Sequence, residues 1–178
     1  MSISIVVATD IKGGIGKDNK LPWDLPSDIK HFRDLITDKI IVMGRKTFES
    51  VIKYKLPCKE SIILSRNEKE STHGNHHLSN SFENVLKYVQ RQNEEVFIIG
   101  GAEIYNLFLP YTDTIYLTEI LEVHDCDTFF PLDLEDYVNY KVEDTVGYKS
   151  DESNKNSYMF RTLKRIVDKF DIELEGEY

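Results

Sequence analysis

Cysteine and long apolar runs are both scarce in this chain. Two cysteines, Cys58 and Cys126, are too few and too far apart for a disulfide framework, so we expect a reducing, cytoplasmic location. The apolar run near the N-terminus, in MSISIVVAT, is too short for a signal peptide or a membrane span, and no basic leader precedes it. We therefore expect neither a disulfide scaffold nor a membrane partner.

Positive charge is also in short supply, with 22 lysines and arginines against 31 aspartates and glutamates and a formal net charge of −9. Nucleic-acid backbones are held by clustered cations, and no such cluster dominates here, so we expect no nucleic-acid partner. An anionic cofactor would need a local cationic pocket. No repeat, proline-rich linker or low-complexity tract divides the 178 residues, which predicts one domain.

The common phosphate-binding motifs and metal-binding patterns are missing as well. Neither G-x-G-x-x-G nor G-x-x-x-x-G-K-[ST] occurs, and the glycine-rich stretch 13–18 fits neither pattern. His73, His76 and His77 stand in a polar stretch without supporting ligands, so we expect a solvated loop there and no metal site. His31 is expected to be exposed on its helix.

Short apolar runs alternate with helical patterns, which is typical of a mainly parallel sheet with right-handed crossovers. We expect a single-domain α/β fold over residues 1–165, with a twisted, mostly parallel sheet of about eight strands, an antiparallel edge hairpin and about four flanking helices. The loop of the hairpin, 148–156, is expected to be mobile, and residues 166–178 form an acidic tail. The strand-like runs are 3–9, 40–43, 61–65, 96–99, 114–121, 140–147 and 157–164, and the helical patterns are 27–35, 45–51, 82–92 and 103–109.

The stretch 15–32, IGKDNKLPWDLPSDIKHF, concentrates candidate chemistry. Pro22 and Pro26 push the residues before them out of helical geometry, which predicts an ordered loop followed by a helix. Asp28 falls in the first turn of that helix, and Trp23 comes from the loop that covers it. Because burial raises the pKa of a carboxyl group while a helix N-terminus favours its charged form, Asp28 is a candidate proton-handling group. Taken singly, such an aspartate is more often a helix cap, and a loop tryptophan is more often core.

Four further blocks of sequence follow this stretch along the chain. After IGKDNKLPWDLPSD at 15–28 come IVMGRKTFES at 41–50, IILSR at 62–66, IIGGAEIY at 98–105 and YLT at 116–118. In their order and spacing, over residues 3–163, the blocks resemble dihydrofolate reductase. The resemblance implies reduction of 7,8-dihydrofolate, a small-molecule substrate, to tetrahydrofolate by NADPH, in support of one-carbon metabolism. We expect a monomer.

By resemblance, the pterin ring of the substrate lies against the end of the first strand and the start of the first helix. Asp28 hydrogen-bonds the amide edge of the ring with Thr118 on the same side, and Trp23 and Leu21 complete the implied catalytic set. Asp28 would raise the proton affinity of the pterin, directly or through water, while hydride passes to C6 and a proton to N5. Ile29 and Phe32 share one apolar helical stripe with Leu35. The implied substrate-binding residues are Val6, Val7, Asp28, Ile29, Phe32, Val51, Leu56, Lys59, Ile99 and Thr118.

Two cationic segments and a glycine pair are the implied cofactor site. Residues 44–47 and 65–66 each follow a strand and present cations and backbone N–H groups to an anion. By resemblance they take the pyrophosphate and the 2′-phosphate, which favours NADPH over NADH; a surface role for Lys46 stays open. Gly100 and Gly101, joined in the family by a cis peptide bond, would let a pyrophosphate approach closely. The implied cofactor-binding residues are Ala8, Ile15, Asn19, Leu21, Gly44, Arg45, Lys46, Thr47, Leu64, Ser65, Arg66, Ile99, Gly100, Gly101, Ala102, Glu103, Ile104 and Tyr105.

Two positions depart from the family's pattern. Cys58 and Lys59 stand where Gly-Arg is common, and a lysine offers one compact charge instead of a planar fork to the glutamate carboxylate of folate. We therefore expect a weaker grip on the glutamyl tail, unless a neighbouring lysine of the basic loop 51–56, Lys53 or Lys55, compensates. Cys126 stands where glycine is frequent, before Asp127, which by resemblance steadies the loop that closes over the nicotinamide. The bulkier neighbour bears on how that loop closes.

Two alternative functions remain open. One is a reductase of the same fold that acts on another pterin or on a pyrimidine, although the Leu-Pro-Trp triplet and Asp28 speak against it. The other is a non-catalytic folate or NADPH binder, although every residue that the chemistry needs is present. An assay of NADPH oxidation with dihydrofolate separates all three readings.

Overall fold

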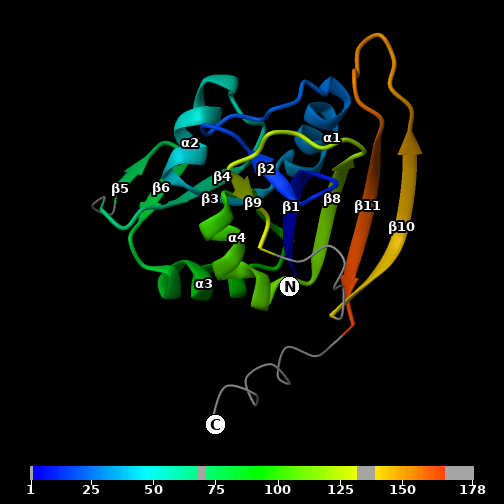
Figure 1. The fold of residues 1–178 in the computed structure, drawn as a ribbon. Coiled ribbons are helices and arrows are strands. Elements are labelled where there is room, and N and C mark those ends of the chain that lie inside the picture. Colours follow the sequence, from blue (N-terminus) through cyan, green and yellow to red (C-terminus); the bar gives the residue numbers. More distant parts are fainter. Residues whose placement is uncertain (1, 68–70, 132–138, 167–178) are drawn as a thin grey trace.

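Nine strands form one sheet in the computed structural model of the chain, which describes residues 2–67, 71–131 and 139–166. A second, two-stranded sheet joins β2 (Gly14–Gly16) to β9 (Thr128–Phe129). From one edge to the other, the strands of the main sheet are β10 (Tyr140–Tyr148), β11 (Tyr158–Arg165), β8 (Thr114–Ile120), β1 (Ile3–Asp10), β7 (Val96–Ile98), β3 (Ile40–Gly44), β4 (Glu60–Leu64), β6 (His76–Ser79) and β5 (Ser71–His73) (Figure 1).

Strand direction divides the main sheet into a parallel centre and two antiparallel edges. β1 pairs in parallel with β7 and β8, and β3 pairs in parallel with β4 and β7. β6 continues this direction beside β4, whereas β10 and β11 at one edge and β5 at the other pair antiparallel. The parallel strands therefore end along one edge of the sheet, which is where open α/β folds bind their ligands.

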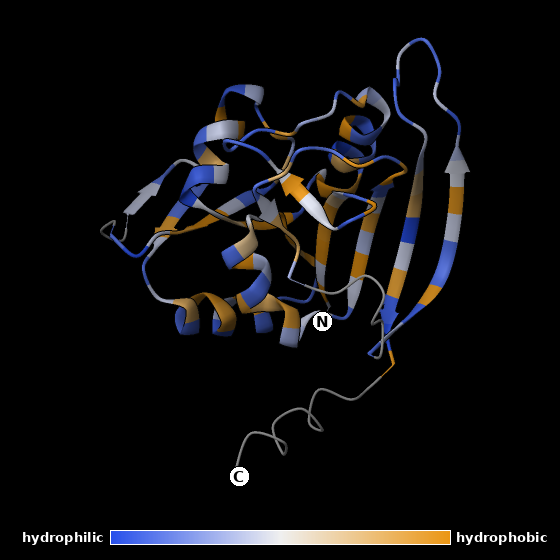
Figure 2. Ribbon diagram, viewed as in Figure 1, coloured by the Kyte–Doolittle hydropathy of each residue, from blue (hydrophilic) through white to orange (hydrophobic). Residues whose placement is uncertain are grey.

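Four α-helices among the described residues cover the two faces of the sheet (Figure 1). α1 (Pro26–Ile36) and α2 (Arg45–Val51) lie on one face, and α3 (Phe82–Gln90) and α4 (Ala102–Phe108) lie on the other. Short 3-10 turns follow α2 and α4, namely η1 (Ile52–Tyr54) and η2 (Leu109–Tyr111). Figure 2 shows hydrophobic and hydrophilic residues alternating around α3, as expected for a helix with one buried face.

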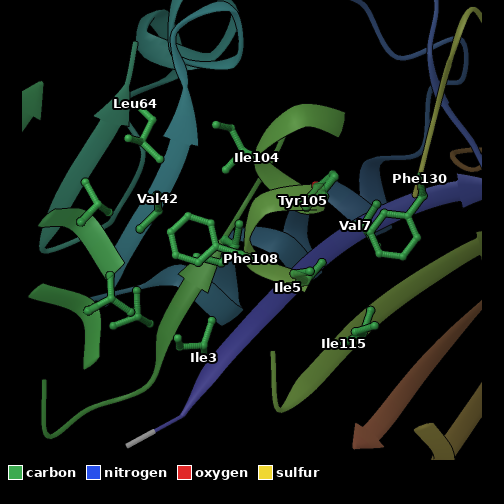
Figure 3. Packing of buried hydrophobic residues seen from close by; sticks show 14 of the residues in the cluster. Ile3, Ile5, Val7, Val42, Leu64, Ile104, Tyr105, Phe108, Ile115 and Phe130 are labelled. Atoms are coloured by element: carbon green, nitrogen blue, oxygen red, sulfur yellow. The ribbon is translucent and has the colours of Figure 1, made fainter. Parts of the chain in front are cut away.

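Successive residues of β1 point to opposite faces of the sheet, so this strand contributes to two hydrophobic cores. Ile5 and Val7 pack with Phe108 of α4 on one face (Figure 3). Val6 joins the core on the opposite face, which includes Ile36 of α1. Because a fully buried side chain of this size contributes roughly 1.5–3 kcal/mol, the two cores hold β1 firmly between the helical layers.

The predicted α/β class, with its parallel centre, antiparallel hairpin and four helices, is confirmed. The main sheet has nine strands, where about eight were predicted. The polar stretch 71–79, for which no strand was predicted, pairs as β5 and β6. The loop predicted for His73, His76 and His77 is therefore wrong: all three lie on these strands. Strand pairing at this edge rests on backbone hydrogen bonds, and an edge strand readily carries polar side chains.

The histidine stretch is held by side-chain hydrogen bonds as well as by backbone pairing. His76 Nδ1 lies 2.6 Å from Ser61 Oγ, and His77 Nδ1 lies 3.0 Å from Thr72 Oγ1. Over the residues that the structure describes, no group of three or more histidine, cysteine, aspartate or glutamate side chains is arranged to hold a metal ion.

One further expectation about the surface needs correction. His31 is half-buried, because its ring stacks on Phe160 with centroids 4.1 Å apart, and burial lowers its pKa. The sequence showed only the helix that carries His31, not the β11 side chain packed on it. The hairpin loop 148–156 contains two buried side chains, Asn154 and Asn156, and its expected mobility stays a prediction. Its contacts are described with the site below.

Among the described residues, no helix is long and apolar enough to span a bilayer. The predicted acidic tail, apart from Ile166, lies outside the residues that the structure describes, and the proposed boundary at residue 165 stays a prediction.

Candidate active site

The predicted site residues gather where the parallel strands end. β1 carries Val6, Val7 and Ala8 toward this edge, and the pairing of β1 with β8 sets Ala8 beside Thr118. The ends of β3 and β7 are joined by a hydrogen bond from Gly44 N to Gly100 O, 2.8 Å long. Sequence segments far apart in the chain thus meet at one edge of the sheet.

Asp28 is the buried acid of this edge. The residue is 9% exposed, and its carboxyl group accepts a hydrogen bond from the Thr118 hydroxyl. Burial is the larger influence and raises the pKa of Asp28 to about 6, while the hydrogen bond from Thr118 acts in the opposite direction. Such a carboxyl group can take up and release a proton near neutral pH. The predicted burial of Asp28 is confirmed, and its part in proton transfer stays a prediction.

The start of α1 is fixed from outside the helix. Pro26 occupies the first helical turn, where a missing N–H costs little, and Leu25 provides no side-chain cap. The cap comes instead from the hairpin loop, because Ser27 N donates a hydrogen bond to Asn154 Oδ1 at 3.0 Å. Asn154 is buried and is held in turn by Asp151, whose Oδ1 accepts from Asn154 N at 2.7 Å. The hairpin loop therefore positions the first turn that carries Asp28.

Trp23 is buried on the same side of the site. It is 7% exposed and packs in a cluster with Leu25, Ile120 and Tyr158, against which Ala8 also rests. The ring of His124 meets the indole edge-to-face, with centroids 5.3 Å apart. The indole Nε1 of Trp23 is buried and has no hydrogen-bond partner among the described residues. Trp23 is thus a packed side chain on this side of the site.

Tyr105 lies beneath the site as a brace between α4 and β1. Its hydroxyl donates a hydrogen bond to Val6 O at 2.8 Å, and burial together with the charge of Asp28 raises its pKa. The side chain is 5% exposed and belongs to the core shown in Figure 3. Tyr105 is therefore a core side chain, and the effect of the Asp28 charge on its pKa shows that the two groups are neighbours.

The glycine pair meets Tyr105 as well. The Gly100–Gly101 peptide bond is cis, as the resemblance implied, and Gly100 has a φ of 112°. A Cβ added to Gly100 would lie 3.0 Å from Tyr105 Oη. Both the backbone conformation and the close approach require glycine at this position.

The three predicted phosphate-binding cations lie on the surface. Arg45 pairs with Glu49 at 2.5 Å, Arg66 pairs with Glu103 at 3.4 Å, and Lys46 is exposed. Pairs between exposed groups contribute only about 0–1 kcal/mol, so both arginines remain available to a doubly charged phosphate. Glu103, included in the predicted cofactor set, is thus the ion-pair partner of Arg66, and its contact with the cofactor stays a prediction.

Lys59 has a carboxylate partner too. Its ammonium group lies 2.5 Å from Glu94 Oε1. Chiefly through this hydrogen bond, the pKa of Lys59 is raised and the pKa of Glu94 is lowered. At this position, where arginine is common in the family, the single charge of Lys59 is thus already paired with Glu94.

The loop 11–23 lies against the turn 121–127. Asp18 and Asn19 adopt positive φ values of 50° and 58° at its tip, and Asp18 N donates to Asp127 Oδ2 at 3.0 Å. Asp127 N donates to Gly16 O at 2.9 Å. Leu21, predicted to face the nicotinamide, is 53% exposed. These two hydrogen bonds are the contacts through which Asp127 would steady the loop, as predicted.

The apolar stripe predicted for α1 divides between core and surface. Phe32 and Leu35 pack against the core beneath α1, whereas Ile29 is 50% exposed. Val51 and Leu56, also predicted at the substrate, rest partly buried against the same core. The stripe therefore runs from a core contact at Phe32 and Leu35 to an exposed apolar side chain at Ile29.

A cavity of about 210 Å³ lies behind α2. It shares Val51 and Leu56 with the predicted substrate site and is lined more deeply by Phe48, Cys58 and His76. Asp28 does not line it. The cavity therefore adjoins the predicted site but is not its reacting centre.

Three residues of the site were not found from the sequence. Asn154 caps α1 across 127 positions of the chain, and His124 packs on Trp23 from a turn with no regular pattern. Asp10 is buried at the end of β1 and accepts hydrogen bonds from the neighbouring loop. Only Asp10 carried a signal, since a charged residue closed an otherwise apolar strand.

The chain is similar to known proteins over most of its length. The family model for dihydrofolate reductase matches residues 2–165. The dihydrofolate reductase of Haemophilus influenzae is 41% identical over 166 residues, which cover 93% of this chain and 99% of that protein. The dihydrofolate reductase of Bacillus subtilis is 37% identical over 158 residues, which cover 89% of this chain and 91% of that protein.

A solved structure is similar as well. It is the dihydrofolate reductase from Enterococcus faecalis complexed with NADP(H) and RAB-propyl, with a TM-score of 0.84 and 31% sequence identity. The similarity covers 93% of this chain and 97% of that chain.

Asp28→Asn is predicted to stabilise the fold at neutral pH. Folding raises the pKa of this carboxyl group from 3.8 to about 6. The protonated group therefore contributes to the stability of the fold at low pH, and this contribution is lost as the pH rises through about 6. At pH 7 the buried charge costs about 3 kcal/mol, which a neutral amide avoids. Urea unfolding should show a gain approaching that size at pH 7 and a much smaller one at pH 4. A gain that does not vary with pH would contradict this account.

Proposed function

The chain belongs to the dihydrofolate reductase family, and on this premise we propose that it reduces 7,8-dihydrofolate to 5,6,7,8-tetrahydrofolate with NADPH. The observation that carries the proposal is the buried carboxyl group of Asp28, whose pKa is raised to about 6. It lies at the sheet edge near Tyr105, which also contacts Gly100. An acid poised near neutral pH at this edge suits a reaction that adds a proton to a ring nitrogen.

The proton side of the reaction falls to Asp28. Reduction requires a hydride at C6 and a proton at N5 of the pterin. Asp28 would accept hydrogen bonds from the amide edge of the ring, and its negative charge would raise the proton affinity of the pterin. Thr118 holds the carboxyl group in place through its hydrogen bond, and Trp23 walls the site with its free Nε1 donor. Exclusion of water by this wall strengthens the electrostatic effect.

The residues present fit a dinucleotide cofactor. At Gly100 a side chain would collide with Tyr105, so the backbone there stays bare. Arg45, Lys46 and Arg66 supply cations near the ends of β3 and β4. These residues would hold NADPH, which supplies the hydride when bound, and a 2′-phosphate would compete with weakly held carboxylates for the two arginines.

The substrate beyond the pterin would rest on the apolar rim of the site. Ile29 exposes an apolar side chain at the start of α1, and Val51 and Leu56 are only partly buried. Contact with the aromatic ring of folate would remove this apolar surface from water, at about 25 cal/mol per Å². Lys59 would offer its charge to the glutamyl carboxylate, in competition with Glu94.

We further propose that the protein acts as a monomer in the cytoplasm on small molecules alone, with no nucleic-acid partner. Its two cysteines are free, and its net charge of −9 disfavours a polyanionic partner.

Asp28→Asn should reduce turnover at pH 7 by roughly 10²–10⁴-fold. Without the carboxylate, the pterin must take its proton from solution, so the loss should shrink as pH falls toward 5. NADPH oxidation with dihydrofolate measures the rate, and quenching of protein fluorescence by NADPH provides the control for cofactor affinity, which should change little. Full activity in the variant at pH 7 would remove Asp28 from the mechanism.

Lys59→Arg should lower the KM for dihydrofolate, because a planar fork can grip the glutamyl carboxylate bidentately even beside Glu94. Glu94→Gln in the natural background is the matched control, since it frees Lys59 without changing its shape and should lower KM as well. Steady-state kinetics at low salt measure both. An unchanged KM in both variants would show that residue 59 does not contact the substrate.

A further inference from the structure

The turn 52–55, which is η1 together with Lys55, is held only weakly by its own interactions. The hydrogen bond that closes it, from Lys55 N to Ile52 O, is long at 3.4 Å. Lys55 has a φ of 45°, in the left-handed region that residues with a side chain disfavour. Tyr54 is 60% exposed and adds little packing. The position of this turn therefore depends on contacts from outside it.

The space beneath the turn is not filled by side chains. Ile52 and Lys55 line the cavity of about 210 Å³ that lies behind α2, and its lining also includes Ser61 of β4 and His76 of β6. A group that faces a void lacks packing contacts on that side. The strands of the sheet therefore give this turn little support.

Arg33 of α1 ties the turn to the neighbouring helix. Its Nη1 donates a hydrogen bond to Tyr54 O at 3.3 Å, and its Nη2 donates one to Lys55 O at 3.4 Å. Over the described part of the chain, these are the two side-chain hydrogen bonds to the backbone of the turn. Because the guanidinium group is planar and bonds both carbonyls at once, it fixes the orientation of the turn as well as its distance from α1.

This tie joins two apolar walls of the proposed substrate site. Phe32 directly precedes Arg33 on α1, and Ile29 lies one helical turn earlier. Val51 and Leu56 flank the turn on either side, and both pack against the same core as Phe32. The distance from the turn to α1 therefore sets the gap between the helix wall, formed by Ile29 and Phe32, and the turn wall, formed by Val51 and Leu56.

We propose that Arg33 is a positioning residue, which holds the turn against α1 and so sets the width of the gap that would receive the aromatic ring of the substrate. The inference rests on the proposed function for its kinetic consequence, but the tie itself does not depend on turnover. Arg33 acts through the turn and does not touch the reacting atoms. Without the tie, Lys55 leaves the left-handed region and the turn wall moves away from the helix wall.

Arg33→Met removes both hydrogen bonds and keeps a long side chain. The KM for dihydrofolate should rise by roughly 3-fold to 10-fold, the scale of one exposed hydrogen bond. The value of kcat should change little, because the pterin and the cofactor keep their contacts. The kcat/KM for 6-methyl-7,8-dihydropterin, which lacks the aromatic ring and the glutamyl tail, should stay the same. An equal loss with both substrates would mean general damage to the site and would overturn the proposal.

Substitution of Lys55 separates a tie from a direct contact between Arg33 and the substrate. Glycine adopts a positive φ without strain, so it keeps the turn in place with less help. In the Arg33→Met background, Lys55→Gly should therefore recover most of the lost affinity for dihydrofolate. Lys55→Met is the matched control, since it removes the same charge but keeps a side chain, and it should recover none. If the two double variants have the same KM, strain at residue 55 plays no part and the positioning role is refuted.

Amide exchange tests the tie without turnover. In Arg33→Met, the Lys55 amide proton, which is bonded to Ile52 O, should exchange faster by the same roughly 3-fold to 10-fold. The Lys59 amide proton, bonded to Lys39 O at 2.9 Å beyond the turn, should exchange at its natural rate. Faster exchange at both positions would point to general loosening and would contradict the proposal.

Lys30→Met is the matched control for charge and helix. Lys30 is an exposed cation of α1 that pairs with Asp34 at 2.6 Å. Its loss should change neither the KM for dihydrofolate nor amide exchange at Lys55. If Lys30→Met and Arg33→Met behave alike, the effect comes from helix charge and the proposal is overturned.

The proposed function and the tie can fail independently. If the natural protein does not oxidise NADPH with dihydrofolate, the proposed function is wrong, while amide exchange at Lys55 still decides whether Arg33 holds the turn. If the natural protein turns over but Arg33→Met changes neither KM nor exchange at Lys55, the function stands and the positioning role is refuted.

Discussion

The burial of one carboxyl group, Asp28, is the constraint on which the rest of the site depends. Taking this group out of water raises its pKa to about 6, and the hydrogen bond from Thr118 partly offsets the cost. The surrounding structure maintains this costly arrangement through contacts that carry no chemistry of their own. Asn154 fixes the helix start, and Trp23 closes the wall. The strands and helices thus position a group that would be more stable in solvent.

Charge is distributed to suit an acidic protein that must bind anions. Arg45, Arg66 and Lys59 each pair with a carboxylate. Because these pairs are exposed, each contributes little to stability and yields to a better anion. The net charge of −9 therefore does not argue against phosphate binding at this edge.

Much of the site could be predicted from the sequence because its residues lie in contiguous blocks. Asp28 and its helix, and the Gly100–Gly101 pair, follow from local patterns of proline, glycine and apolar spacing. Contacts between distant segments could not be predicted in this way. Asn154 reaches Ser27 from a hairpin loop, and β5 and β6 form through backbone pairing that needs no apolar side chains. His31 was misjudged for the same reason, since Phe160 covers it from another strand.

The direct test of this account is the pKa of the Asp28 carboxyl group in the folded protein without ligands, measured by titration of its ¹³C side-chain resonance. The account predicts a midpoint of about 6. A midpoint at or below the ordinary 3.8 would mean that the group is solvated, and the proposed role of burial in the reaction would be contradicted.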